Sequence, residues 1–201
     1  HTVVTGKRGS VLEFLTRGPF LPTTREATLP LRVCNIDEVK VTATRVYPNN
    51  LVAFFRDGTS TAARNGVVVG RRGFVPGGDA GTVRTVKIGL DSVLGDADCG
   101  IFRVRAEDVG NSWRHHSRVV VRTGIGLSAT MTARNVSIAA VSLDDSTPLA
   151  DCRIDVFSNR NQRLASGMTD AAGDLRLSLP RVSESDGEEP FLVTASRGED
   201  L

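Results

Sequence analysis

Apolar and polar residues alternate with a period of two along most of this chain. In residues 39–47, Val39 and Val41 lie on one side of an extended backbone, and Lys40 and Thr42 lie on the other, which is the pattern of a half-buried β-strand. The same alternation predicts further strands at residues 83–90, 100–106, 117–122, 136–143, 152–157, 163–168, 175–179 and 191–195. Since almost no segment has the period of an amphipathic helix, the chain is predicted to be all-β.

Turn-forming residues separate the predicted strands. Glycine, proline, asparagine, aspartate and serine gather at residues 57–58, 76–79, 144–148, 158–161 and 170–174, and each of these residue types favours a turn. Short strands at regular spacing, joined by such turns, are typical of antiparallel sandwiches.

Residues 49–56 are the exception to this pattern. An asparagine that is able to cap a helix is followed by apolar residues at helical spacing and then by the Asp57-Gly58 pair, which ends the segment. These features predict one short helix. Residues 59–79 are rich in glycine, arginine and small polar residues, and they predict a long loop or an irregular hairpin.

The length of 201 residues fits two domains of about 100 residues each. An apolar strand ends at Arg122, the residues Thr123-Gly124 follow, and a new set of alternating strands begins there. We therefore predict two immunoglobulin-like antiparallel β-sandwich domains. The first, residues 1–122, contains the short helix and the 59–79 loop, and the second, residues 123–201, has seven or so short strands.

Composition and charge narrow the range of functions. The 25 lysines and arginines nearly balance the 23 acidic residues, and the formal net charge of +2 is spread without a basic run, which argues against nucleic-acid binding. No window approaches the roughly 18 consecutive apolar residues of a membrane-spanning helix, so we expect no membrane contact by this segment. The chain begins and ends without a leader or a terminating pattern, and we expect a piece of a longer protein.

Three stretches resemble the N-terminal macroglobulin-like domains of bacterial alpha-2-macroglobulins. The first runs from Leu29 to Leu51, and the second is the linker-like segment at 119–127, in which Gly124 stands where an aspartate is usual. The third contains the Thr-Asp-x-x-Gly turn at 169–173 and the closing strand at 190–195. The resemblance covers nearly the whole chain, and it implies two macroglobulin-type sandwiches, the second of the MG2 type.

The resemblance also implies a function. A bacterial alpha-2-macroglobulin is a broad-range protease inhibitor of the periplasm, often a lipoprotein anchored to the inner membrane, and it meets proteases through its full-length chain. In such a protein this segment would be a scaffold without catalysis or cofactor, in contact with neighbouring macroglobulin domains. None of the three cysteines begins the Cys-x-Glu-Gln thioester motif. An alternative is that the chain comprises immunoglobulin-like modules of a surface adhesin or a polysaccharide-binding protein.

Three patterns with chemical meaning have simpler explanations. Gly124, Gly126 and Ala129 imitate a dinucleotide-binding fingerprint, but the segment that follows is too short for the helix which that site requires. The adjacent His115 and His116 would point to opposite faces of a strand, so they predict an exposed loop pair near the tryptophan instead of a metal site. The aspartates at 144, 145, 170 and 174 are explained by turn formation without invoking calcium.

The remaining candidate chemistry lies with the cysteines. Alternation places Cys152 on the same face as Ile154 and Val156, so we expect an unpaired thiol in the second core. Cys34 and Cys99 both fall in the first domain, and either a disulfide or two free thiols fits the sequence. We predict no catalytic, cofactor-binding or metal-binding residue in this chain.

Overall fold

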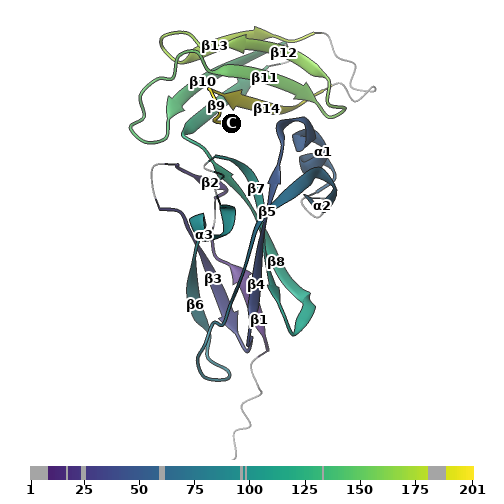
Figure 1. Cartoon of the computed structure of the whole chain (residues 1–201). Coiled ribbons are helices and arrows are strands. Elements are labelled where there is room, and N and C mark those ends of the chain that lie inside the picture. The colour runs from purple at the N-terminus through teal and green to yellow at the C-terminus, as the bar shows by residue number, and fades with distance from the viewer. Residues whose placement is uncertain are drawn as a thin grey trace, which may run out of the picture.

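A computed structural model describes residues 9–16, 18–23, 26–58, 62–95, 97, 99–132, 134–180 and 189–201 (Figure 1). The described residues are mostly β-strand, as the sequence predicts, and they form two modules that follow one another along the molecule. Each of the strands predicted from alternation is present. None of the described helices is long and apolar enough to cross a membrane.

The first module has two sheets that face each other. The smaller sheet has the order β1 (Val11–Phe14), β3 (Thr28–Cys34) and β6 (Arg84–Gly89), and the larger has the order β2 (Phe20–Leu21), β8 (Asn111–Arg122), β7 (Gly100–Asp108), β4 (Val39–Val46) and β5 (Gly66–Phe74). All these neighbours are antiparallel except β2 and β8. Their inward side chains form one core, which includes Phe14, Leu31, Val41 and Phe102.

The short helix predicted at residues 49–56 is confirmed. A turn of 3-10 helix, η1 (Pro48–Asn50), leads into α1 (Leu51–Arg56). The expected side-chain cap is wrong, because the Asn50 side chain instead donates a 3.1 Å hydrogen bond to the carbonyl of Asn65. Two more single-turn helices, α2 (Ala62–Asn65) and α3 (Asp91–Leu94), were not predicted.

The long loop predicted at residues 59–79 is wrong for most of its length. Residues 62–74 form α2 and the nine-residue strand β5, whereas 59–61 lie outside the described residues. Glycine favours loops, but packing requires Gly70 in this strand. A Cβ atom at Gly70 would lie 1.9 Å from the carbonyl oxygen of Val93, so only glycine lets α3 approach the strand.

The second module also has two sheets. One has the order β13 (Asp174–Ser178), β10 (Asn135–Ser142) and β9 (Ile125–Met131), and the other has the order β12 (Arg163–Met168), β11 (Arg153–Ser158) and β14 (Pro190–Ser196). The described residues thus hold six strands here, close to the seven or so expected. Their core includes Val136, Ile138, Cys152, Ile154 and Val156. Every described strand pair lies within 11–122 or within 125–196.

Candidate functional site: the junction between the modules

A small apolar cluster lies where the two modules meet. Val46 ends β4, Ile101 lies near the start of β7, and Leu51 and Phe54 come from α1; all four are buried. Leu192 of β14 and Leu201 pack against this cluster from the second module, and Figure 1 shows α1 and the C-terminal end on that side of the first module. Because apolar area is removed from water between the modules, the contact favours one arrangement of the two.

The cluster borders an apolar hollow of about 230 Å³. Residues of both modules line it: Phe20, Leu51, Phe55, Ile101, Val121, Thr123, Ile125, Leu127, Leu192, Val193, Thr194, Ala195 and Leu201. Phe20 is 61% exposed and Phe55 is 38% exposed at its rim. The packing at the junction is therefore open on one side.

Hydrogen bonds fix the two linking residues. Thr123 is buried, its N–H donates to the carbonyl of Leu21 at 3.2 Å, and its hydroxyl accepts from the N–H of Ile125 at 3.0 Å. The N–H of Gly124 donates to a carboxylate oxygen of Asp200 at 2.7 Å. Both ends of the second module thereby hold the same short linker.

Three further hydrogen bonds between described residues cross from one module to the other away from the linker, and one of them runs from the Asn161 side-chain amide to the carbonyl of Asn49 at 3.4 Å. The Arg56 guanidinium at the end of α1 donates to the carbonyl of Asn159 at 3.0 Å, and the Cys99 thiol donates to the carbonyl of Glu199 at 3.0 Å. These contacts lie on separate elements and are spread around the apolar cluster. Rotation of one module against the other would break several of them together.

An ion pair secures the end of β8 just before the linker. Arg122 is 8% exposed, and its guanidinium donates to the carboxylate of Asp91 at the start of α3. The pair joins the last residue of the larger sheet to a helix that packs on β5. The position of the linker is thus coupled to the body of the first module.

The two adjacent histidines lie within β8 and not in the predicted loop. The ring of His116 is half-buried, and its Nδ1 accepts a 2.8 Å hydrogen bond from the N–H of Phe14. His115 Nδ1 is 3.2 Å from the carbonyl oxygen of Ser112, on an exposed ring. Burial, followed by the nearby positive charge of Arg118, lowers the pKa of His116. His116 therefore secures β1 against β8 as a neutral acceptor.

A disulfide between Cys34 and Cys99 does not form. Cys34 ends β3 as a buried free thiol, near the end of the module where Val39 pairs with Asp108. Cys99 precedes β7 at the other end, where Val46 pairs with Ile101. Seven residues of strand separate these ends by about 23 Å, far beyond the Cα distance of a disulfide, about 7 Å at most.

Cys152 behaves as predicted. It immediately precedes β11, is fully buried in the same core as Ile154 and Val156, and is a free thiol. Burial raises the pKa of the Cys152 thiol above its ordinary value, so the neutral form is favoured. Its packing, and not its reactivity, explains its place in the core.

The remaining sequence candidates are structural. Residues 125–131, which follow the apparent dinucleotide fingerprint, form the strand β9 and leave no helix end to bind a pyrophosphate. Asp170 accepts hydrogen bonds from the N–H groups of Ala172 and Asp174 at 2.9 and 3.0 Å, as a turn residue does. Among the described residues no group of three His, Cys, Asp or Glu side chains is placed to hold a metal ion.

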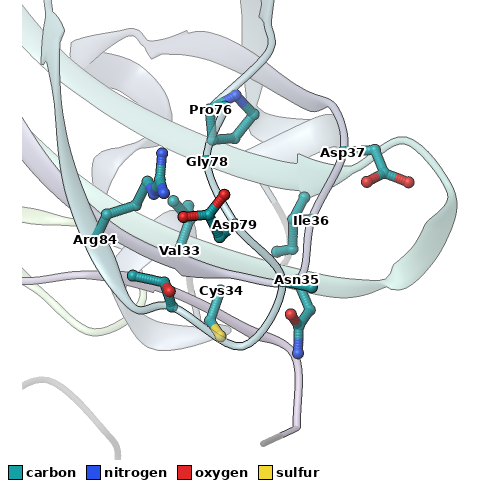
Figure 2. Close-up of a pocket in the computed structure, with 12 residues that line it drawn as sticks. Val33, Cys34, Asn35, Ile36, Asp37, Pro76, Gly78, Asp79 and Arg84 are labelled. Carbon is teal, nitrogen blue, oxygen red and sulfur yellow. The ribbon is translucent and has the colours of Figure 1, made fainter.

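A polar pocket of about 260 Å³ (Figure 2) lies beside the segment between β5 and β6, at the end of the first module away from the junction (Figure 1). Its walls come from residues 33–37, at and just after the end of β3, and from residues in the 76–84 segment, which leads into β6. Asn35 has a positive φ of 52°, and its side-chain oxygen accepts a 2.6 Å hydrogen bond from the N–H of Gly81. The Cys34 thiol has no histidine beside it in this wall, so the pocket lacks the base that a nucleophilic cysteine requires.

The structure describes two antiparallel β-sandwich domains that share a small apolar cluster at their junction. Residues 122–201 match the family model described as the bacterial alpha-2-macroglobulin MG3 domain. The resemblance to bacterial alpha-2-macroglobulins noted in the sequence is therefore confirmed for this part of the chain. The domain number in that description differs from the MG2 type expected above. No curated protein matches the chain.

Solved structures support the same fold for the whole chain. Native alpha-2-macroglobulin from Escherichia coli spanning domains MG0-NIE-MG1 matches with a TM-score of 0.73 and 19% identity, over 100% of this chain and 65% of that one. The shorter Escherichia coli structure spanning NIE-MG1 matches with a TM-score of 0.71 and 18% identity, over 95% and 94%. The Salmonella alpha-2-macroglobulin mutant Y1175G matches with a TM-score of 0.67 and 23% identity, and this chain spans only 12% of its length.

Proposed function

We propose that this chain is a scaffold segment of a bacterial alpha-2-macroglobulin that inhibits proteases in the periplasm. The observation that carries the proposal is the junction, where a buried cluster and hydrogen bonds from separate elements hold the two modules in one arrangement. A protein that rearranges around a protease needs parts that transmit movement without deforming. A pair of sandwiches locked in this way suits that role.

The proposal assigns no catalysis to this segment. The described histidines and cysteines are engaged in packing or in backbone hydrogen bonds, and none forms a nucleophile-base pair. One of the solved relatives is described as a trypsin-activated alpha-2-macroglobulin from Escherichia coli. By analogy, we propose that proteases act on the full-length protein outside this segment, and that an inner-membrane lipid anchor, where present, also lies outside it.

The test compares this chain with the full-length protein that contains it. Each is mixed with trypsin at equal molar amounts, and the remaining hydrolysis of a large protein substrate is measured. We expect the full-length protein to protect the substrate and the 201-residue chain to leave hydrolysis unchanged. Stoichiometric inhibition by this chain alone would contradict the scaffold role, and a full-length protein without any effect on proteases would contradict the trap. Fractionation of bacterial cells tests the periplasmic location.

A further inference from the structure

The outer face of the larger sheet in the first module carries a basic groove. We define the basic groove as the hollow of about 540 Å³ lined by Lys40, Thr42, Thr44, Gly66, Val68, Arg71, Arg103, Arg105 and Glu107. These residues come from three adjacent strands, β4, β5 and β7 (Figure 1). The sequence shows no basic run, so only strand pairing brings the four cations together.

Positive charge in the basic groove is only partly neutralised. Glu107 is its one carboxylate, and it is shared between Lys40 Nζ at 2.9 Å and Arg105 Nη2 at 2.8 Å. These two contacts lower the pKa of Glu107, with Lys40 as the larger cause, so Glu107 remains ionised. Four cations against one carboxylate leave an excess of three positive charges on the lining. Arg71 and Arg103 form no ion pair with a described residue.

Arg103 combines partial burial with few polar partners. Its side chain is half-buried, and the only hydrogen bond recorded for it among the described residues runs from Nη2 to the hydroxyl of Ser117 at 3.0 Å. The Nε atoms of Arg103 and Arg105 are buried without an acceptor. Burial, followed by repulsion from Arg105, lowers the pKa of Arg103. Since an unpaired buried donor costs free energy, an anion placed in the groove would recover part of that cost.

The geometry points to a short, extended acidic peptide segment as the occupant of the basic groove. Arg103 and Arg105 are two residues apart on one face of β7, and alternate side chains of an extended peptide have the same spacing of about 6.6 Å. Lys40 to Thr44 spans about 13 Å of strand, which matches four residues of such a peptide. Carboxylates at alternate positions would then meet arginines, while the threonine hydroxyls supply polar contacts.

The test is a binding titration of the 201-residue chain with two labelled peptides. One peptide alternates aspartate and threonine, and the other replaces each aspartate with asparagine. We expect the aspartate peptide to bind at least about tenfold more tightly, and its affinity to fall as salt rises from 20 to 200 mM. Equal binding of both peptides, or no binding of either at low salt, would overturn the inference.

Two variants on β5 make a matched pair. Arg71 lines the basic groove, whereas the next residue, Arg72, is exposed, pairs with the core residue Val41 and does not line the groove. Arg71→Gln should weaken binding of the aspartate peptide about threefold, and Arg72→Gln should change it by less than about 1.5-fold. Equal losses in the two variants would show a diffuse charge effect and overturn the site.

Arg103→Gln probes the half-buried cation directly, with an expected loss of about tenfold. Because this change also removes the bond to Ser117, its thermal unfolding is recorded beside the titration. If it does not fold, the Arg71 and Arg72 pair still decides the inference. A polysulfated oligosaccharide that binds more tightly than the aspartate peptide, with equal sensitivity to both β5 variants, would also reject a peptide site.

Discussion

The carboxylate of Asp200 accepts a 2.7 Å hydrogen bond from the backbone N–H of Gly124, across 76 residues of sequence. Asp200 lies in a tight turn, where its backbone and that of Arg197 exchange hydrogen bonds of 3.0 and 3.2 Å. The turn therefore presents a fixed acceptor to the linker. This contact therefore joins the last residues of the second module to its first residues.

Replacing Asp200 with alanine should loosen the junction. The change leaves the partly buried N–H of Gly124 without an acceptor, which costs about 1–2 kcal/mol of unfolding free energy. Hydrogen exchange at the Gly124 amide should accelerate, and urea denaturation should give the loss of stability. Asp200→Asn retains an acceptor oxygen and should lose less. Glu199→Gln alters the exposed neighbouring carboxylate and should leave both measurements unchanged; an equal effect there would contradict the role of Asp200.

Gly70→Ala should destabilise the first module by about 1–3 kcal/mol through overpacking. The new methyl group would meet the backbone carbonyl of Val93, which cannot rotate away as a side chain would. Thermal unfolding measures the effect. Gly89→Ala in β6 is the matched control, since nothing lies within 4 Å of a Cβ built there, and it should stay within about 0.5 kcal/mol of the original protein. Similar losses at both positions would contradict the packing argument.

Gly70 also illustrates why part of the fold could not be predicted from the sequence. β12 begins and ends at the residues predicted, and β11 differs from its prediction by one residue at each end, because its buried and partly exposed side chains alternate cleanly. β5 is an edge strand with glycines at 66, 70 and 73, and its exposed valines leave no apolar face to read. β8 starts six residues earlier than expected, because Asn111 to His116 extend past the core with few apolar side chains.

The junction and the basic groove could not be predicted from local patterns. Alternation indicates which side of a strand is buried, but it does not indicate which distant segment covers it. Gly124 and Asp200 are 76 residues apart and are brought together by the fold of the second module. Arg71 and Arg103 line one groove because β4 lies between β5 and β7. Such contacts depend on topology, so the sequence predicted the sandwiches and not the surfaces between and around them.

The buried cysteines should react with thiol reagents much more slowly in the native protein than in the unfolded protein. Cys34 and Cys152 are at most 2% exposed, and burial raises the pKa of Cys152, which further limits its thiolate. A thiol reagent at pH 8 should modify these two residues slowly in the native protein and rapidly in urea, as followed by absorbance and mass spectrometry. Rapid native labelling of Cys152 would contradict its burial. A peptide joining Cys34 to Cys99 in a non-reduced digest would contradict their separation.

The acid side of the stability profile should depend on His116. Burial and, to a smaller extent, the charge of Arg118 lower its pKa below the ordinary value of 6.5, His115 acts in the same direction, and Glu13 opposes them. The unfolded chain therefore binds a proton at a higher pH than the folded protein does. The contribution of His116 is complete above about pH 6.5 and is lost as the pH falls from there toward the lower folded pKa.

The urea concentration at the unfolding midpoint should therefore decrease when the pH is lowered from 7.5 to 5.5. The decrease should be smaller in His116→Asn. The asparagine oxygen can accept the hydrogen bond from Phe14 N–H, which His116 Nδ1 accepts in the original protein, but it does not bind a proton in this range. His115→Asn should keep the original slope, because the His115 ring is exposed and its one hydrogen-bond contact among the described residues is to Ser112 of the same strand. Urea denaturation at several pH values measures all three proteins. Parallel curves for His116→Asn and the original protein would show that protonation of His116 does not govern the acid loss of stability, and the half-buried ring would then be a packing element alone.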